Sequence, residues 1–351
     1  MAEFPTTPEQ ITAEWLSGVT GRDVRNVDWE PIGTGQVGDS IRLTCTDNGS
    51  GDPFTLAAKL PAADETSRQT AAMMSLYAKE VLFYRDIAPH LSARIPEVHF
   101  SDIDDTGAAF ILLFEDLGPA RGGDQIAGCD LSDAEHAIGQ AAAFHAPSWE
   151  NARLLSHNDL QMAPEKRALY AGLYPQAHAT WRERYDGILE PEYMELCDRI
   201  AAMAAQIMTR EVDARCVVHG DFRLDNMLFG IKGGAEPIAI LDWQTVTLGH
   251  PMTDIGYFLG CGIGDTLRRK HEDHLMELYL AEMAKRGVTL TREDTWDDYR
   301  RGALHGVMTA VFSAAFVERT ERGDANFLLM ARGACALALE HDSLGAITET
   351  T

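Results

Sequence analysis

Short apolar stretches in the first third of the chain have the alternation that is typical of β-strands. In Ile41–Thr46 every second side chain is apolar, and Phe54–Leu60 is a second apolar run. The residues between them, 47–53, read DNGSGDP and are dense in turn-forming residues. The pattern therefore predicts a β-hairpin. A further short strand is expected at Ile111–Phe114, with a Gly-Pro pair that stops the chain soon after it.

Helical periodicity covers most of the remaining chain. Residues 8–20 are expected to form an opening helix, and residues 66–88 a second one. From about residue 131 the pattern is mostly helical, with one β interruption at 216–242. The expected fold class is therefore α+β.

A break between two lobes is expected near residues 115–120. At roughly 150 residues per domain, a length of 351 residues suggests two domains or lobes. We expect a small β-rich N-lobe at residues 1–117 and a larger, mainly helical C-lobe at residues 118–351.

A lysine and a glutamate are expected to form an ion pair. Lys59 stands at the end of the apolar strand 54–60, where a charged side chain is disfavoured unless it has a partner. Side chains spaced by 4, 3, 4 and 3 residues in the expected helix share one face, namely Met73, Tyr77, Glu80, Tyr84 and Ile87. Glu80 is the charge on that face, so it can pair with Lys59. The alternative is that Glu80 lies at the rim of the face and reaches water.

Composition places the chain among globular proteins and limits its partners. It has 54 Asp and Glu against 30 Lys and Arg, a formal net charge of −24, with 45% hydrophobic and 8% aromatic residues. The acidic excess disfavours binding to nucleic acid and to anionic membrane surfaces, and it favours a cationic substrate. In its plainest interpretation the excess charge serves solubility.

Neither the N-terminal sequence nor the cysteines indicate export. MAEFPTTPEQ lacks a basic start and an apolar core, and no apolar run approaches the ~18 residues of a membrane span. The six cysteines are scattered and include no CxxC pair, which argues against a zinc ribbon and a disulfide scaffold. We therefore expect a cytoplasmic protein.

A glycine-rich segment precedes the predicted hairpin. Residues 33–38, GTGQVG, fit the pattern GxGxxG through Gly33, Gly35 and Gly38. A dinucleotide-binding fold has a helix directly after such a loop, whereas here strand periodicity follows. The loop is therefore interpreted as a hairpin turn that covers the phosphates of a nucleotide, with a plain β-turn as the alternative.

The strongest motif is the run 217–229, VVHGDFRLDNMLF. An apolar lead-in places Asp221 at its end, and Asn226 follows five residues later. A return strand at 238–241 ends in Asp242, and the hairpin is expected to bring Asn226 and Asp242 to the same end. A carboxylate there can accept the proton of a hydroxyl, and oxygen ligands suit Mg²⁺. In the plain structural alternative, Asp221 caps a turn and Asp242 is a loop residue.

Taken together, these motifs resemble the aminoglycoside phosphotransferase and choline kinase-like family, a small-molecule branch of the protein kinase-like fold. HGDFRLDN at 219–226 matches the HGDxxxxN signature, and DWQ at 242–244 matches the metal-binding motif. GHP at 249–251 with TDI at 253–255 is similar to the G-D-P…D-L-A segment of that family. The resemblance covers about residues 30–340. The DWQ form is frequent in the ecdysteroid kinase-like and acyl-CoA dehydrogenase-associated branches.

The resemblance implies roles for five residues of the C-terminal motifs. Asp221 would be the catalytic base, or the residue that orients the acceptor hydroxyl. Asn226 and Asp242 would hold Mg²⁺. His219 would stabilise the catalytic loop, with proton transfer as the alternative. Asp254 would brace the C-lobe through hydrogen bonds, with a substrate-side role as the alternative.

It also implies a nucleotide site in the N-lobe. Lys59 would bind the α- and β-phosphates of ATP, and Glu80 would orient Lys59. Backbone groups from Glu115 to Leu117 would meet the adenine. The chain departs from the family pattern at Ser40, where a valine is usual, and at His250, where an acidic residue is expected. The loop over the phosphates would be formed by Gly33, Gly35 and Gly38.

Two other motifs have structural interpretations. HEDH at 271–274, flanked by Arg268, resembles a metal cluster but is expected to be a solvated helix face. Four aromatic residues have helical spacing and are expected to pack in the core or at an interface, with an apolar acceptor pocket as the alternative: Tyr170, Tyr174, Trp181 and Tyr185.

The expected function is that of an ATP- and Mg²⁺-dependent phosphotransferase that moves the γ-phosphoryl group to a hydroxyl of a small molecule. The acceptor is compatible with an aminoglycoside, a choline-like amine, a sugar, a steroid or a hydroxyacyl compound, and both cationic and apolar compounds are therefore candidates. Nothing in the sequence sets the oligomeric state. The alternatives are a non-catalytic nucleotide-binding protein of the same fold, a metal-dependent hydrolase, and a dinucleotide-dependent enzyme, which the strand after Gly38 opposes.

Overall fold

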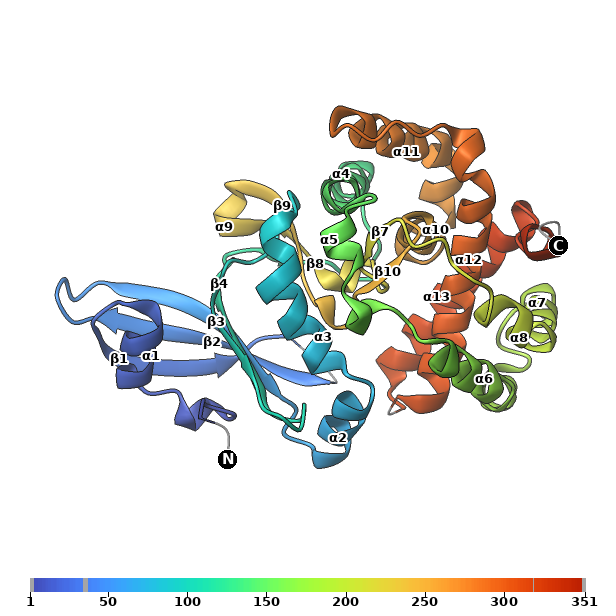
Figure 1. The fold of residues 1–351 in the computed structure, drawn as a ribbon. Coiled ribbons are helices and arrows are strands. Elements are labelled where there is room, and N and C mark those ends of the chain that lie inside the picture. The colour runs from blue at the N-terminus through green and yellow to red at the C-terminus, as the bar shows by residue number, and fades with distance from the viewer. Residues whose placement is uncertain (1–2, 34–36, 318, 349–351) are drawn as a thin grey trace. The chain divides into compact units, whose positions relative to one another are not determined.

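The computed structural model describes residues 3–33, 37–317 and 319–348, and this part of the chain forms two compact units (Figure 1). Unit 1 comprises the chain up to His90, Arg94–Ala120 and Gly230–Thr245. Unit 2 comprises Leu91–Ala93, Arg121–Phe229 and the chain from Val246 onward. Unit 1 thus takes in a segment, 230–245, from far beyond the sequence-based boundary at 117/118.

Unit 1 is built on a five-stranded antiparallel sheet with the strand order β1-β2-β3-β5-β4. The predicted hairpin is confirmed, because β2 and β3 pair with Ser40 opposite Lys59. Strand β1 was not predicted, since its side chains are largely exposed and give no apolar alternation. The strands are β1 Val24–Pro31, β2 Gly38–Asp47, β3 Pro53–Pro61, β4 Val98–Ile103 and β5 Phe110–Glu115.

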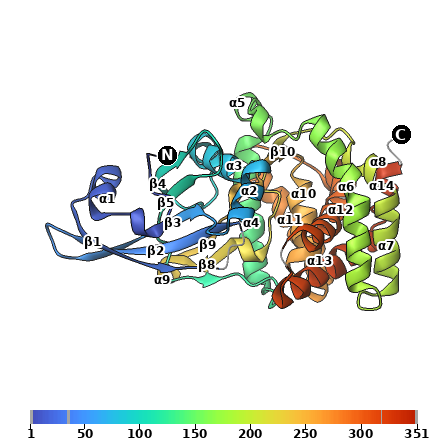
Figure 2. The same ribbon diagram turned by 90° about the horizontal axis from the view of Figure 1, so that it is seen from below.

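The alternation read from the sequence produces the core of this sheet. Every second residue of β2 and β3 points into one apolar cluster, which also receives Leu16 of helix α1, Ala13–Thr20. Helix α1 packs against β1 and β4, and Figure 2 shows it lying over the sheet. The opening helix expected at 8–20 is in two pieces, a 3-10 turn at Pro8–Gln10 and α1, whose first turn is capped by Thr12.

The continuous helix expected at 66–88 is wrong. The chain forms α2, Glu65–Met73, and α3, Leu76–Leu82, with Ser75 between them in the left-handed region at φ 61°. Helical π and 3-10 turns follow at Phe83–Ile87 and Ala88–His90. The break rotates α2 relative to α3, so Met73 does not share the buried face and is 79% exposed.

The segment 230–245 closes unit 1. It contains the short helix α9, Ile231–Gly234, the strand β9, Glu236–Ile240, and a 3-10 turn at Trp243–Thr245. The Ile240 N–H donates to the carbonyl of Arg94, and the Arg94 guanidinium pairs with Glu236 at 2.5 Å. The Trp243 ring is buried and stacks on Phe83, with ring centroids 4.0 Å apart. Asp242 therefore lies in the chain between Ile240 and Trp243, which these contacts hold in place.

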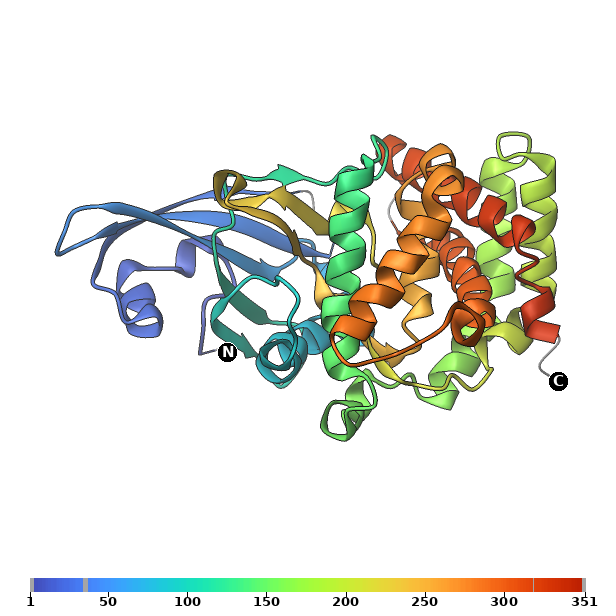
Figure 3. The ribbon, with the colours of Figure 1, turned by 90° about the horizontal axis from the view of Figure 1, so that it is seen from above.

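Unit 2 is mainly helical, and α12 lies against α6, α10 and α13. Figure 3 shows α11, in orange, beside α4, in green. Shorter turns occur at Asn158–Leu160, Leu224–Asn226 and Phe258–Gly262. The helices are α4 Leu131–Ser148, α5 Ala152–Leu155, α6 Pro164–Tyr185, α7 Pro191–Ala202, α8 Ala204–Met208, α10 Met252–Tyr257, α11 Asp265–Lys285, α12 Arg292–Phe316, α13 Glu321–Glu340 and α14 Gly345–Thr348.

Two pairs of short antiparallel strands frame the HGD run. Strand β7, Cys216–Val218, pairs with β10, Thr247–Gly249. Strand β6, Arg121–Gly122, pairs with β8, Met227–Gly230. The residues between β7 and β8 form a loop that both pairs hold at its ends. We call residues 219–226 the catalytic-motif loop.

Glycines allow α10 and α12 to approach closely. A Cβ atom on Gly256 of α10 would lie 2.7 Å from the backbone of Gly302 in α12, a distance that no side chain tolerates. The close crossing brings Tyr257 of α10 beside His305 of α12, with ring centroids 5.2 Å apart. Both residues contact the catalytic-motif loop, as described below.

The interpretation of residues 271–274 as a solvated helix face is wrong at Glu272, which is buried. The flanking Arg268 is buried as well. The side chains of Arg268 and Glu272 pair at 2.9 Å, and Arg268 also lies 2.8 Å from Glu340 of α13. Three of the four aromatic residues of α6 are buried as expected, namely Tyr174, Trp181 and Tyr185, and Tyr170 is partly buried.

The described helices were also compared with the requirements of a membrane span. Across the ranges that the structure covers, none is both long enough and apolar enough to cross a bilayer.

Candidate functional site

In unit 1, the predicted ion pair between Lys59 and Glu80 is confirmed. The Nζ atom of Lys59 lies 2.7 and 2.9 Å from the two carboxylate oxygens of Glu80. The same Nζ lies 2.8 Å from Oδ1 of Asp242. Glu80 is 1% exposed, so the alternative in which it reaches water is wrong. The Lys59 side chain as a whole is 13% exposed.

Burial and charge act in opposite directions on this cluster. Burial acts to lower the pKa of Lys59, but the Asp242 and Glu80 carboxylates outweigh it and hold the pKa above its usual value. Burial also raises the pKa of the Glu80 carboxyl above its usual range, while Lys59 works against that rise. Lys59 is therefore a fixed positive charge.

The glycine-rich segment leads into the strand opposite Lys59. Gly33 lies after β1 with φ +78°, and Gly35 lies outside the described residues. At Gly38 a Cβ atom would be 3.0 Å from the Leu60 carbonyl oxygen and 3.4 Å from Cε of Lys59. The Tyr77 hydroxyl donates to the Val37 carbonyl at 2.5 Å. The end of the segment is thus bound to α3 and packed against Lys59.

Some backbone groups between Glu115 and Leu117 already form hydrogen bonds within the protein. The Glu115 N–H donates to the Glu97 carbonyl at 3.0 Å, and the Leu117 carbonyl accepts from the Lys232 N–H at 2.8 Å. An adenine would therefore use the remaining groups of this segment or the second lone pair of the Leu117 carbonyl. Whether this backbone meets an adenine stays a prediction.

The Glu115 side chain is held in a separate ion cluster. Its carboxylate lies 2.5 Å from both Arg94 and Lys232, and it accepts the Glu97 N–H at 2.9 Å. Burial would raise the pKa of Glu115, but these donors outweigh burial and lower the pKa to about 2. The carboxylate is therefore ionised at neutral pH and ties Arg94 to the segment 230–245.

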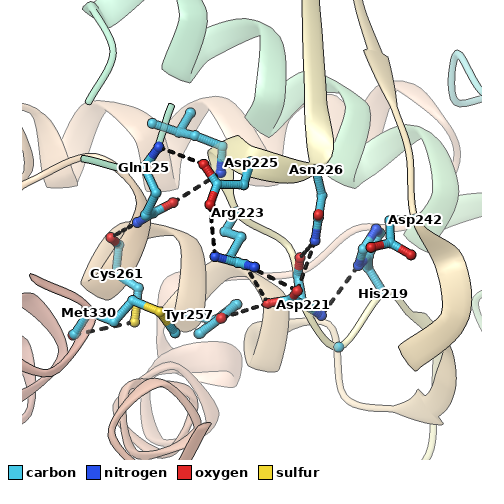
Figure 4. A network of polar contacts seen from close by, with 12 residues as sticks. Gln125, His219, Asp221, Arg223, Asp225, Asn226, Asp242, Tyr257, Cys261 and Met330 are labelled. Carbon is cyan, nitrogen blue, oxygen red and sulfur yellow. Dashed lines mark hydrogen bonds and ion pairs between the residues drawn. The ribbon is translucent and has the colours of Figure 1, made fainter. Parts of the chain in front are cut away.

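In unit 2, the Asp221 carboxylate is surrounded by donors (Figure 4). The Tyr257 hydroxyl donates to Oδ1 at 2.7 Å, and the Asn226 amide nitrogen donates to Oδ2 at 2.9 Å. The Nε atom of Arg223 lies 2.9 Å from Oδ1. Burial would raise the pKa of Asp221, but Arg223, Tyr257 and the other partners outweigh it and lower the pKa to about 2.

The start of the loop is held by Asp254. This buried carboxylate accepts the backbone N–H groups of His219 at 2.7 Å and Gly220 at 2.9 Å. The His219 ring is fully buried, and its Nδ1 accepts the Asp221 N–H at 3.3 Å. Both residues thus lie where they can support the loop. Their predicted role remains a proposal.

The oxygen atoms that would hold a metal are hard ligands. The Asn226 nitrogen is used by Asp221, so the amide oxygen is the atom left for a metal. In Asp242 one oxygen binds Lys59, and the other accepts from Gln244 at 3.3 Å. This donor set suits Mg²⁺, which takes few protein oxygens together with substrate phosphates. Asn226 lies in unit 2 and Asp242 in unit 1, and their predicted approach stays a prediction.

A larger metal cluster beside Asn226 and Asp242 was sought among the described residues. In the ranges that the structure describes, no group of three or more His, Cys, Asp or Glu side chains could hold a metal ion.

Sequence reasoning missed several residues that surround Asp221. Arg223 was visible inside the quoted motif, two positions after Asp221, and its charge was the available signal. Tyr257 and His305 gave no local signal, because tertiary packing of α10 and α12 brings them to the loop. The Nε2 atom of His305 lies 2.8 Å from the Gly220 carbonyl.

Comparison with known proteins gives matches to one family and to solved kinase-like structures. Residues 40–291 match the ecdysteroid kinase-like family. The human (Homo sapiens) acyl-CoA dehydrogenase family member 11 is 28% identical over 163 residues, which cover 46% of this chain and 20% of that protein. The chain therefore spans about a fifth of the length of this curated relative.

Solved structures share the fold. An aminoglycoside 2'-phosphotransferase-IIIa in complex with GDP is 16% identical, covers 88% of this chain and 93% of its own, and has a TM-score of 0.54. A microcompartment-associated aminopropanol kinase is 15% identical, covers 95% and 98%, and has a TM-score of 0.56. The expected protein kinase-like fold, with its β-rich N-lobe and mainly helical C-lobe, is confirmed.

Proposed function

Because the chain belongs to the ecdysteroid kinase-like family, we propose that it transfers the γ-phosphoryl group of ATP to a hydroxyl group of a small molecule, with Mg²⁺. The observation that carries the proposal is the position of Lys59, whose ammonium lies between Glu80 and Asp242. A buried lysine held by two carboxylates, beside a glycine-rich segment, is the arrangement that kinases use to bind nucleotide phosphates. It has no purpose in a metal-dependent hydrolase.

The residues of the two units would divide the work. Lys59 would bind the α- and β-phosphates, and Glu80 would hold its ammonium in place. Asn226 and Asp242 would hold Mg²⁺, which neutralises charge on the phosphates when it is bound. Gly33, Gly35 and Gly38 would let the backbone approach the phosphates.

Asp221 would receive the acceptor. Its oxygens already accept bonds from Tyr257, Asn226 and Arg223, which fix the direction of the carboxylate. A hydroxyl that donates to this carboxylate is aimed with its oxygen toward the γ-phosphorus. The oxygen–phosphorus bond then forms as the bond to the bridging oxygen of ADP breaks, and the hydroxyl proton is released.

The acceptor is proposed as a small hydroxyl compound. The name of one structural neighbour is that of an aminoglycoside phosphotransferase and that of another is an aminopropanol kinase, so amino alcohols are tested first. The net charge of −24 favours the same cationic class. Sterols and hydroxyacyl thioesters form the apolar arm of the same screen. A cytoplasmic location also stays a prediction.

The proposal is tested by ADP release from Mg²⁺ and ATP with each compound. We expect at least one acceptor to stimulate ADP release, and the Asp221→Asn variant to lose that stimulation while it still binds ATP. Retained phosphoryl transfer by Asp221→Asn would contradict the role proposed for Asp221 and the proposed function. ATP binding without turnover for every acceptor would favour the non-catalytic alternative, and activity without nucleotide would favour a hydrolase.

A further inference from the structure

Arg223 lies between two carboxylates of the catalytic-motif loop. Its Nε atom is 2.9 and 3.1 Å from the two oxygens of Asp221. Its Nη1 atom donates to Oδ2 of Asp225 at 3.1 Å. The Arg223 side chain is 20% exposed, so most of it is removed from water. A planar fork that meets one carboxylate at each end has little freedom to rotate.

Asp225 is itself fixed from outside the loop. Its Oδ1 accepts the Gln125 N–H at 2.8 Å and lies 3.7 Å from Arg322 of α13. Gln125 is 1% exposed and also accepts the Leu224 N–H at 3.2 Å. Its amide nitrogen donates to the Cys261 carbonyl, so it joins the loop to the turn after α10 (Figure 4).

The contacts form one chain from the buried Gln125 to Asp221. Gln125 holds Asp225, Asp225 holds Arg223, and Arg223 contacts both oxygens of Asp221. On the far side, Tyr257 and Asn226 donate to one oxygen each. Without Arg223, none of the donors to Asp221 among the described residues spans both oxygens, and the carboxylate gains freedom to turn about its Cβ–Cγ bond.

We propose that Arg223 is a positioning residue for Asp221, and that Asp225 and Gln125 are the parts that hold Arg223 in place. The inference rests on the proposed function, in which Asp221 aims the acceptor hydroxyl. A poorly aimed hydroxyl lowers the rate of phosphoryl transfer but not the affinity of the protein for the nucleotide, because the nucleotide is bound by other residues. Arg223 therefore acts through the direction of Asp221, and it need not touch either substrate.

The variants separate this role from simple stabilisation. Arg223→Lys keeps the charge but has no fork, Arg223→Met removes the charge, and Asp225→Asn removes the outer anchor with little change of shape. Arg292→Met is the matched control, because Arg292 pairs with Asp273 at 2.6 Å on the exposed surface of the same unit. Melting temperatures are measured for all four.

The activity readout uses Mg²⁺, ATP and the compound that gives the highest ADP release in the screen above. We expect Arg223→Met to lower kcat by about 100-fold, with the KM for ATP within about twofold of wild type. Arg223→Lys should recover part of the loss, and Asp225→Asn should lower kcat in the same direction. Combining Arg223→Met with Asp225→Asn should cost little more than Arg223→Met alone.

Three results overturn the inference. The first is an unchanged kcat in Arg223→Met. The second is a kcat loss no larger than that of Arg292→Met. The third is a loss that disappears after correction for the folded fraction, since that pattern indicates a structural role alone.

A second readout does not depend on turnover, so it separates this inference from the proposed function. In ¹⁵N NMR spectra the Arg223 Nε–H signal, assigned by its absence in Arg223→Lys, should exchange slowly with water. In Asp225→Asn we expect that exchange to become at least tenfold faster, while Arg292→Met leaves it unchanged. If the wild type transfers no phosphate, the proposed function fails. If Asp225→Asn does not alter the exchange rate of the Arg223 Nε–H, the positioning chain is rejected, whether or not the wild type is active.

Discussion

The carboxylate of Asp254 accepts the backbone N–H of His219 at 2.7 Å. Its other oxygen accepts the N–H of Gly220 at 2.9 Å, and the ring of His145 lies 3.2 Å away. All of these groups except part of Gly220 are buried. A side chain from α10 thus binds the start of the loop that carries Asp221, and it satisfies two backbone donors, of which the His219 N–H is buried.

Asp254→Asn is expected to destabilise the protein. The amide nitrogen of asparagine cannot accept a hydrogen bond, so one of the two N–H groups loses its partner. We expect the free energy of unfolding to fall by about 1.5–3 kcal/mol, the range for hydrogen bonds to a charged group. Urea unfolding measures it. Asp159→Asn, at an exposed position of the same unit, is the control and should change stability by less than about 0.5 kcal/mol. Equal effects of the two variants would contradict the bracing role.

Lys59 and Glu80 are expected to be coupled in stability. Lys59→Met leaves the buried Glu80 carboxylate without its cation and should cost about 3 kcal/mol, whereas Glu80→Gln should cost less because Lys59 keeps Asp242 as a partner. The double variant leaves neither charge unpaired within the pair and should cost clearly less than the sum. Urea unfolding of the four proteins measures the coupling, and all three variants should lose ATP turnover.

An ion pair on the surface provides the comparison for this double-mutant cycle. Arg85 and Asp102 lie 3.7 Å apart in the same unit and are about half exposed. Their coupling, measured with Arg85→Met and Asp102→Asn, should be at most about 1 kcal/mol because water screens the charges. A coupling for Lys59 and Glu80 as small as this one would show that the buried pair does not stabilise the fold.

The spacing of residues in the sequence was enough to pair Lys59 with Glu80, but not to find the break in the helix before it. Tyr77, Glu80 and Tyr84 all follow Ser75, so their common face survives the break, whereas Met73 precedes it and turns to solvent. Serine is an ordinary helix residue, and only tertiary packing places Ser75 in the left-handed region.

Partners that are distant in sequence are the part that local patterns could not supply. In the sequence, Arg268 is one of several charges on a polar helix. In the structure, its guanidinium pairs with Glu340 of α13 at 2.8 Å. Tyr257 and His305 reach the catalytic-motif loop because two helices cross closely at Gly256 and Gly302. The local sequence contains no signal that shows which helices will pack against each other.

The pH dependence of stability is expected to reveal the ion cluster around Glu115. In the folded protein Arg94 and Lys232 lower the pKa of Glu115 to about 2, below the usual value of 4.5. A lowered carboxyl pKa adds stability that is complete above the unfolded pKa and is lost as the pH falls toward the folded one. Wild type should therefore be more stable than Glu115→Gln at pH 6, and the difference should shrink between about pH 5 and pH 2. Urea unfolding across that range tests it, and a difference that grows on acidification would reverse the assigned sign.

Gly38→Ala is expected to weaken ATP binding through Lys59. The new methyl group would lie 3.0 Å from the Leu60 carbonyl oxygen and 3.4 Å from Cε of Lys59, so the two strands or the lysine must shift by a few tenths of an ångström. Since Lys59 is proposed to bind the phosphates, we expect the dissociation constant of Mg²⁺ and ATP, measured by calorimetry, to rise about tenfold. Gly18→Ala is the matched control, because a Cβ atom there meets nothing within 4 Å and lies in helix α1. It should leave ATP binding unchanged and raise the free energy of unfolding by about 0.5–1 kcal/mol. If Gly38→Ala binds ATP as tightly as Gly18→Ala does, the close contact at Lys59 has no part in nucleotide binding.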